Sequence, residues 1–180
     1  MARSVSEPWR HVVTWREIGE GPQRLRLEAD ESTRAKIAKA LRLESLSTLR
    51  ADLALKPWLD GVEIDGRLRA VAGRICGVTL DPYDESVEET FRLTVLPAGS
   101  PHAPAESETE DVAIDLDAED PPDVVAGEGV DLGHYVVEQL SLSLDPFPRK
   151  PDAVFEAPPE SEDASPFAAL AALKRPKDAG

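Results

Sequence analysis

Few residues of this 180-residue sequence combine the chemistry and the spacing that catalysis or metal binding needs. The single cysteine, Cys76, has no partner for an internal disulfide, which fits a reducing compartment. We expect it to be a small buried apolar residue. The histidines His11, His102 and His134 are not accompanied by a Gly-x-Ser-x-Gly turn or a comparable motif. We therefore predict no catalytic residue and no enzymatic activity.

The fragment Gly127-Glu-Gly129 contains two of the glycines that a phosphate-binding loop uses. It lacks a third glycine, a preceding apolar strand and a nearby lysine, so it does not predict a nucleotide site. We expect these glycines to set a turn.

Charge divides the chain into two unlike halves. Residues 1–92 contain 15 Lys and Arg against 16 Asp and Glu, whereas residues 93–180 contain 5 against 19. No Lys or Arg occurs from Leu93 through Pro148. Such a surface repels phosphate backbones and suits a basic partner. Acidic segments that serve only to solvate the chain are the commoner alternative.

Two groups of charged residues are candidate binding surfaces. The first, the acidic flank, consists of Asp111, Asp115, Asp117, Glu119, Asp120 and Asp123. The second, the basic set, consists of Lys36, Lys39, Arg42, Arg67, Arg69 and Arg74. The basic set would contact RNA if strands and helix brought its members together, and the strand positions of Arg67 and Arg69 point the same way. The charge count favours the acidic flank and a basic partner surface.

The elements that must position these residues begin with two short strands, 11–18 and 23–27, on either side of a turn at Gly19-Glu-Gly-Pro22. A helix follows up to Leu43, with Asp30 or Ser32 as its N-cap and Ile37 and Leu41 facing inward.

A period of two then replaces the helical one. Leu49, Ala51, Leu53 and Leu55 alternate with polar residues, and Asp65-Gly66 between two alternating runs is a type I′ hairpin signal. A further strand runs from Val87 to Val95. Three antiparallel strands are the minimum that this pattern predicts.

Residues 98–110 form a loop rich in Pro, Ser and Glu, and 111–117 alternate as an edge strand carrying carboxylates outward. A second helix is predicted over 132–144, because Leu132, Val136, Val137, Leu140 and Leu144 share one face, although the alternation in Leu140-Ser-Leu-Ser-Leu144 also suits a strand. Asp131 is its expected N-cap, and Pro146 forbids its continuation.

Together these elements predict an α+β fold, in which an antiparallel sheet of several short strands is covered by two helices. We expect a single domain over 1–148, an acidic disordered linker over 149–165 and a short C-terminal helix over 166–174. That helix would cap its own core or dock on a partner. The sequence lacks a long apolar run and the apolar middle of a signal peptide, so we predict no membrane segment and a cytoplasmic protein.

Three motifs resemble the YceD family, the large ribosomal RNA subunit accumulation proteins of bacteria and plastids. They are the helix entry Gly127-Glu-Gly-Val-Asp-Leu132 with its Leu-x-Leu-x-Pro exit, the closing Ser165-Pro-Phe-Ala-Ala-Leu-Ala-Ala-Leu-Lys174, and the surroundings of Cys76. The matches span residues 76–174, and residues 1–70 resemble the family only in outline.

Many members of that family carry Cys-x-x-Cys at this strand end and a His and Cys after the proline exit, an arrangement that looks like a four-ligand zinc site. Here the turn reads Cys76-Gly-Val-Thr79, and the segment 148–153 has neither His nor Cys. One ligand of four remains, so we expect no metal and no cofactor.

The resemblance implies a non-enzymatic factor for accumulation of large-subunit ribosomal RNA and ribosome assembly. Its expected partner is a basic ribosomal protein or a preribosomal particle, with the basic set in contact with RNA. The alternative is a module that binds ribosomal RNA directly.

Overall fold

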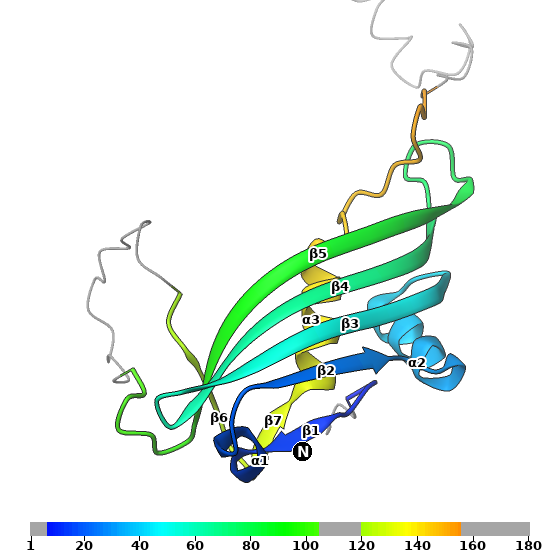
Figure 1. The fold of residues 1–180 in the computed structure, drawn as a ribbon. Coiled ribbons are helices and arrows are strands. Elements are labelled where there is room, and N and C mark those ends of the chain that lie inside the picture. The colour runs from blue at the N-terminus through cyan, green and yellow to red at the C-terminus, as the bar shows by residue number, and fades with distance from the viewer. Residues whose placement is uncertain (1–6, 105–119, 156–180) are drawn as a thin grey trace, which may run out of the picture.

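The computed structural model describes residues 7–104 and 120–155, and its main feature is a five-stranded sheet in the order β2-β3-β4-β5-β6. The strands are β2 (Gln23–Glu28), β3 (Ser45–Trp58), β4 (Gly61–Ile75), β5 (Pro82–Pro97) and β6 (Asp123–Val125). All neighbours are antiparallel except β5 and β6, which run parallel. The sheet is drawn across the middle of Figure 1.

Three helices and a small second sheet complete the described fold. They are α1 (Trp15–Gly19), α2 (Glu31–Leu41) and α3 (Leu132–Ser143), with β1 (Val12–Thr14) paired to β7 (Gly129–Asp131). The predicted α+β class with a mostly antiparallel sheet is therefore confirmed.

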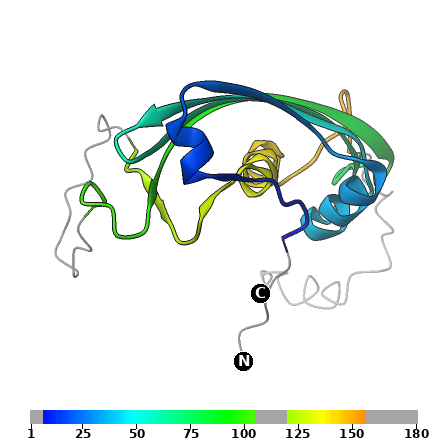
Figure 2. The same ribbon diagram turned by 60° about the horizontal axis from the view of Figure 1, so that its bottom comes forward.

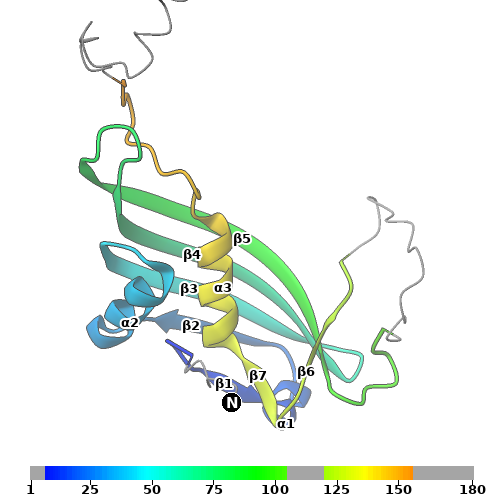
Figure 3. The ribbon, with the colours of Figure 1, turned by 180° about the vertical axis from the view of Figure 1, so that it is seen from behind.

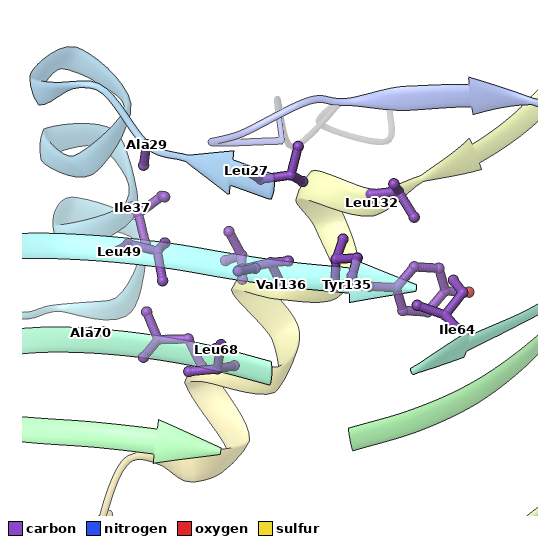
Figure 4. Packing of buried hydrophobic residues seen from close by; sticks show 14 of the residues in the cluster. Leu27, Ala29, Ile37, Leu49, Ile64, Leu68, Ala70, Leu132, Tyr135 and Val136 are labelled. Atoms are coloured by element: carbon purple, nitrogen blue, oxygen red, sulfur yellow. The ribbon is translucent and has the colours of Figure 1, made fainter. Parts of the chain in front are cut away.

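The main sheet arches over α3, and α2 and α1 lie at opposite ends of the same concave side (Figure 2). Seen from behind, α3 crosses the strands of the sheet (Figure 3). The core lies between the sheet and the helices, where Leu27, Leu49, Leu68 and Val136 are buried (Figure 4). Only 5% of the residues in the sequence are aromatic, and this core is accordingly mainly aliphatic.

The sequence predicts α3 well because its signals are local. Asp131 is the N-cap, and its carboxylate accepts from the amides of Gly133 at 3.1 Å and His134 at 3.4 Å. The predicted inward residues Leu132, Val136, Val137 and Leu140 are buried, and Leu144 packs partly against the core. The helix ends at Ser143, before Pro146.

The first long helix is also confirmed. Asp30 caps α2 by accepting from the Thr33 amide at 2.7 Å, and Ile37 is fully buried. The helix ends at Leu41, and its C-cap Arg42 has a left-handed backbone at φ 56°.

The predicted strand over residues 11–18 is wrong in its second half. Thr14 and Glu17 form a reciprocal capping box, so the chain turns into α1 at Trp15. The strand that remains, β1, pairs with β7 rather than with residues 23–27. This pairing depends on residues more than one hundred positions away, which a local pattern cannot indicate.

The predicted turn at Asp65-Gly66 is also wrong, because both residues lie inside β4. The tight connection is Leu59-Asp60, where Leu59 has φ 53° and Trp58 pairs with Gly61. Gly66 serves packing instead, since the ring of Phe91 occupies the space that a Cβ at this position would need. β3, β4 and β5 are consequently long strands of 14, 15 and 16 residues rather than several short ones.

Several predicted elements fall outside the described residues. They are the edge strand at 111–117, the linker beyond residue 155 and the helix at 166–174. The edge strand that the structure does describe is β6, beside the C-terminal end of β5. Among the described residues, none of the helices has the length and the apolar composition needed to span a membrane.

Candidate binding surfaces

The acidic flank is represented in the structure by Asp120 and Asp123, both of them exposed. The other four members, Asp111, Asp115, Asp117 and Glu119, lie outside the described residues. Asp123 begins β6 opposite Val95 and accepts a hydrogen bond from the Tyr135 hydroxyl. Burial raises the pKa of Tyr135 well above its usual range, and the carboxylate of Asp123 raises it further.

The described carboxylates of residues 93–148 have no cationic side chain beside them. In residues 93–104 and 120–148, no carboxylate takes part in an ion pair with lysine or arginine. The carboxylates concerned are Asp120, Asp123, Glu128, Asp131, Glu138 and Asp145. Asp131 is used as a helix cap, and the others have no lysine or arginine partner within the described residues.

The basic set is not a single patch. Arg67 and Arg69 lie on the face of the sheet that no helix covers, whereas Arg74, at the opposite parity of β4, faces the helix side. Lys36, Lys39 and Arg42 are exposed on α2 and its C-cap, at one end of that helix side (Figure 2). Strand parity alone separates Arg74 from the other two arginines, and this signal was available in the sequence.

Arg67 and Arg69 belong to a larger charged surface that the sequence prediction missed. We call it the outer face, and its cations are Arg24, Arg26, Arg50, Lys56, Arg67, Arg69 and Arg92. Its carboxylates are Glu28, Asp52, Glu63, Asp65, Asp84 and Glu88. The period of two within each strand would have found these residues once the register between strands was known.

Ion pairs across the strands neutralise most of the outer face. Arg26 pairs with Asp52 at 2.7 Å, and Glu88 is shared by Arg67 and Arg69. The hydrogen bonds from these two arginines lower the pKa of Glu88. Within the part of the chain that the structure describes, Arg24 is the only cation of the outer face that forms no ion pair.

Asp65 is the centre of a second group of charges on this face. Lys56 contacts it at 2.6 Å and Arg92 at 2.7 Å, and their hydrogen bonds lower the pKa of its carboxyl group. The residue predicted to make a turn thus connects three strands.

A shallow groove of about 760 Å³ crosses the outer face. It is lined by residues of β2, β3, β4 and β5, and none of its lining residues comes from the helices that cover the other side of the sheet. Arg24, Arg26 and Arg67 border it together with Asp52 and Asp65, so its rim carries both signs of charge.

Cys76 is buried, as predicted, at the turn between β4 and β5. Its sulfur accepts from the hydroxyl of Thr79, from the amides of Val78 and Thr79 at 3.4 Å, and from the backbone of Lys150. Led by the Thr79 hydroxyl, these donors lower the pKa of the thiol to about 6. The Gly77 amide also donates to the Pro148 carbonyl at 2.8 Å, so this turn holds the chain that leaves α3.

The residues around Cys76 do not fit the four-ligand zinc arrangement. The groups that approach the sulfur are hydrogen-bond donors, whereas a zinc ion needs further lone-pair donors from Cys or His. Over residues 7–104 and 120–155, no group of three or more His, Cys, Asp or Glu side chains is close enough to hold a metal ion.

Comparison with known proteins gives one match. Residues 64–174 match the model of a protein family described as "Large ribosomal RNA subunit accumulation protein YceD". Neither the curated proteins nor the solved structures gave a match. The matched region begins within β4 and includes the Cys76 turn, β5 and α3.

Proposed function

Because the chain belongs to the YceD family, which is named for accumulation of large-subunit ribosomal RNA, we propose that it is a non-enzymatic ribosome assembly factor. It acts in the cytoplasm by binding a basic ribosomal protein, free or within a preribosomal particle. The acidic flank is its binding surface. The partner is kept from non-specific contacts with RNA until it is incorporated.

One observation supports this proposal: most cations of the outer face take part in ion pairs, whereas the described carboxylates of the second half of the chain do not. Six of the seven cations on the outer face are already paired with carboxylates, whereas the carboxylates of residues 93–104 and 120–148 have no lysine or arginine partner. A basic protein is therefore attracted to these unpaired carboxylates without breaking an existing ion pair. A nucleic acid that binds the outer face must first displace carboxylates before its phosphates can contact arginine.

A pulldown with the full chain as bait, analysed by mass spectrometry, tests the proposal. The wild-type chain is expected to recover ribosomal proteins of the large subunit, and to lose them as salt is raised because the attraction is screened. Recovery of neither ribosomal proteins nor preribosomal particles would end the proposal.

Matched charge variants identify the surface. Changing Asp111, Asp115, Asp117 and Glu119 to their amides is expected to reduce the recovery severalfold. The control changes Glu20, Glu31, Glu44 and Asp60 to their amides, which removes the same charge from exposed positions in the first half of the chain. Equal losses in both variants would show that net charge, and not the acidic flank, determines binding.

The second candidate function is direct binding of ribosomal RNA on the outer face. Its support is the number of arginines on an uncovered sheet and the groove between them. Binding to fragments of large-subunit RNA would then weaken steeply with salt, through release of counterions.

Filter binding separates the two candidates. Arg67→Ala with Arg69→Ala is expected to reduce the salt slope by about 2 if both arginines contact phosphates. Lys36→Ala with Lys39→Ala is the control, because it removes the same charge from α2. A slope that neither pair changes would exclude the outer face as an RNA site.

A further inference from the structure

Within the described residues, one side of β5 has no neighbouring strand along much of its length. β6 pairs only with Val95–Pro97, and no described residue forms a strand beside the preceding part of β5 on the side away from β4. Figure 1 shows this side as the upper border of the sheet. We call residues 83–90 the β5 edge.

The two residues before β6 limit its pairing with β5. Pro121 and Pro122 immediately precede Asp123, the first residue of β6. Proline has no N–H to donate to a neighbouring strand, so β6 cannot be extended backwards along β5.

Thr90 identifies the backbone groups that face the open side. Its N–H donates to the carboxylate of the adjacent Glu89 at 3.1 Å, and the N–H of Ala98, at the same parity, donates to Val125 of β6. Alternate residues of an antiparallel strand direct both their N–H and C=O groups to the same side. Ser86, Glu88 and Thr90 therefore present their backbone groups to the open side of β5.

The β5 edge is strongly acidic. Four of its eight residues are carboxylates, namely Asp84, Glu85, Glu88 and Glu89. Glu88 and Glu85 are paired with arginines of β4, which lie behind the edge, whereas Asp84 and Glu89 form no ion pair within the described residues. Asp123 continues the same negative border at the far end of β5, opposite Val95.

These charges select the kind of strand that fits. A second copy of this chain pairing through the same edge would place carboxylates against carboxylates, which is unfavourable. Phosphates are repelled for the same reason. A strand with lysine or arginine at alternate positions satisfies both the backbone groups and the carboxylates.

We propose that the β5 edge binds an extended, lysine- or arginine-rich segment of a protein partner as an additional strand of the sheet. Such strand addition takes affinity from backbone hydrogen bonds and specificity from the side chains. A segment of about eight residues, about 27 Å long, covers the edge. This inference rests on the proposed function, since it states how the basic partner is held.

Hydrogen exchange measured by NMR on the full chain tests the contact directly. The probe is a ten-residue peptide of alternating lysine and valine. At saturation it is expected to slow exchange of the Ser86, Glu88 and Thr90 amides at least tenfold, and to leave the amides of β2, the other edge strand, unchanged. The same peptide with alternate backbone amides N-methylated keeps its charge and is expected to bind at least tenfold more weakly.

A pair of variants provides a second measurement. Thr90→Pro removes an N–H that faces the open side, a position at which an edge strand tolerates proline. It is expected to weaken peptide binding at least tenfold without lowering the unfolding temperature. Thr90→Val retains the N–H and is expected to bind like the wild type.

Three results would overturn the inference. They are equal affinity of the methylated and unmethylated peptides, protection of β2 instead of β5, and protection of the β5 edge by self-association or by an RNA oligonucleotide.

If Thr90→Pro still recovers the same ribosomal proteins as the wild type, the edge is not their site and the proposed function stands. If the wild type recovers none, the proposed function fails as well.

Discussion

The thiol of Cys76 is enclosed by hydrogen-bond donors, and this arrangement couples its ionisation to folding. The folded pKa of about 6 lies below the ordinary pKa of a cysteine thiol. The thiolate therefore contributes stability that is fully present above pH 9 and is lost as the pH falls through 6.

Cys76→Ser tests this coupling. Between pH 6 and pH 9 the unfolding free energy of the wild type is expected to rise relative to that of the variant. The reason is that the Cys76 thiol, which the variant lacks, loses its proton at a lower pH in the folded state than in the unfolded state. Denaturant unfolding of both proteins at pH 6, 7.5 and 9 measures the difference, in which the other titrating groups cancel. A constant difference across the range would mean that the sulfur is not held as a thiolate.

Arg74 is the member of the predicted basic set whose role is structural. Its guanidinium lies 3.2 Å from Glu85 and donates to the carbonyl of Asp145 at 2.5 Å, and the two side chains are only 11% and 22% exposed. Oε2 of Glu85 is buried and makes no hydrogen bond within the described residues, so it depends on this cation.

Arg74→Met is expected to lower the unfolding free energy by about 2 kcal/mol, because it leaves a partly buried carboxylate without its partner. Arg69→Met is the control, since Glu88 on the exposed outer face keeps Arg67. Denaturant titrations measure both. Equal effects would show that Arg74 contributes no more than a surface arginine.

At the scale of elements, the sequence predicts what depends on neighbouring residues and misses what depends on distant ones. The N-cap and apolar face of α3 are contained within thirteen positions, and both were correct. The partner of β1 lies on β7, and the Asp65-Gly66 signal was overridden by the register of three long strands. The Thr14-x-x-Glu17 spacing is that of a capping box, so the start of α1 is also a local signal in the sequence.

The packing of α3 beneath the sheet gives a matched test on one helix. Leu140→Ala is expected to lower the unfolding free energy by about 3 kcal/mol, since a fully buried side chain is removed from the core. Leu142→Ala, at a position 73% exposed, is expected to change it by less than about 0.5 kcal/mol. Similar losses at both positions would contradict the assigned face of α3.

The β1–β7 pairing is tested at Gly129. A Cβ there would collide with the backbone of Val13 and Thr14, so Gly129→Ala is expected to cost about 2 kcal/mol or more. Gly19→Ala is the control, because no atom lies within 4 Å of the added carbon. Thermal unfolding of the two variants compares them. A neutral Gly129→Ala would mean that β1 and β7 are not in this register.

At the scale of the whole molecule, the charge asymmetry of the sequence becomes a spatial division. The outer face holds nearly balanced charges in cross-strand pairs, while the carboxylates of the second half remain without basic neighbours in the described structure. The sequence predicted the acidic surface from composition. Strand parity already places Arg74 on the opposite face from Arg67 and Arg69, whereas the position of Lys36, Lys39 and Arg42 relative to the sheet depends on the fold.

Sucrose-gradient sedimentation of a cell lysate, with the protein detected by blotting at low and moderate salt, tests the central claim most directly. We expect the wild type to migrate with large-subunit precursors at low salt and to leave them at moderate salt, since charge holds it there. The variant with amides at Asp111, Asp115, Asp117 and Glu119 is expected to leave at lower salt than its matched control. A wild-type protein that stays at the top of the gradient under both conditions would contradict the account.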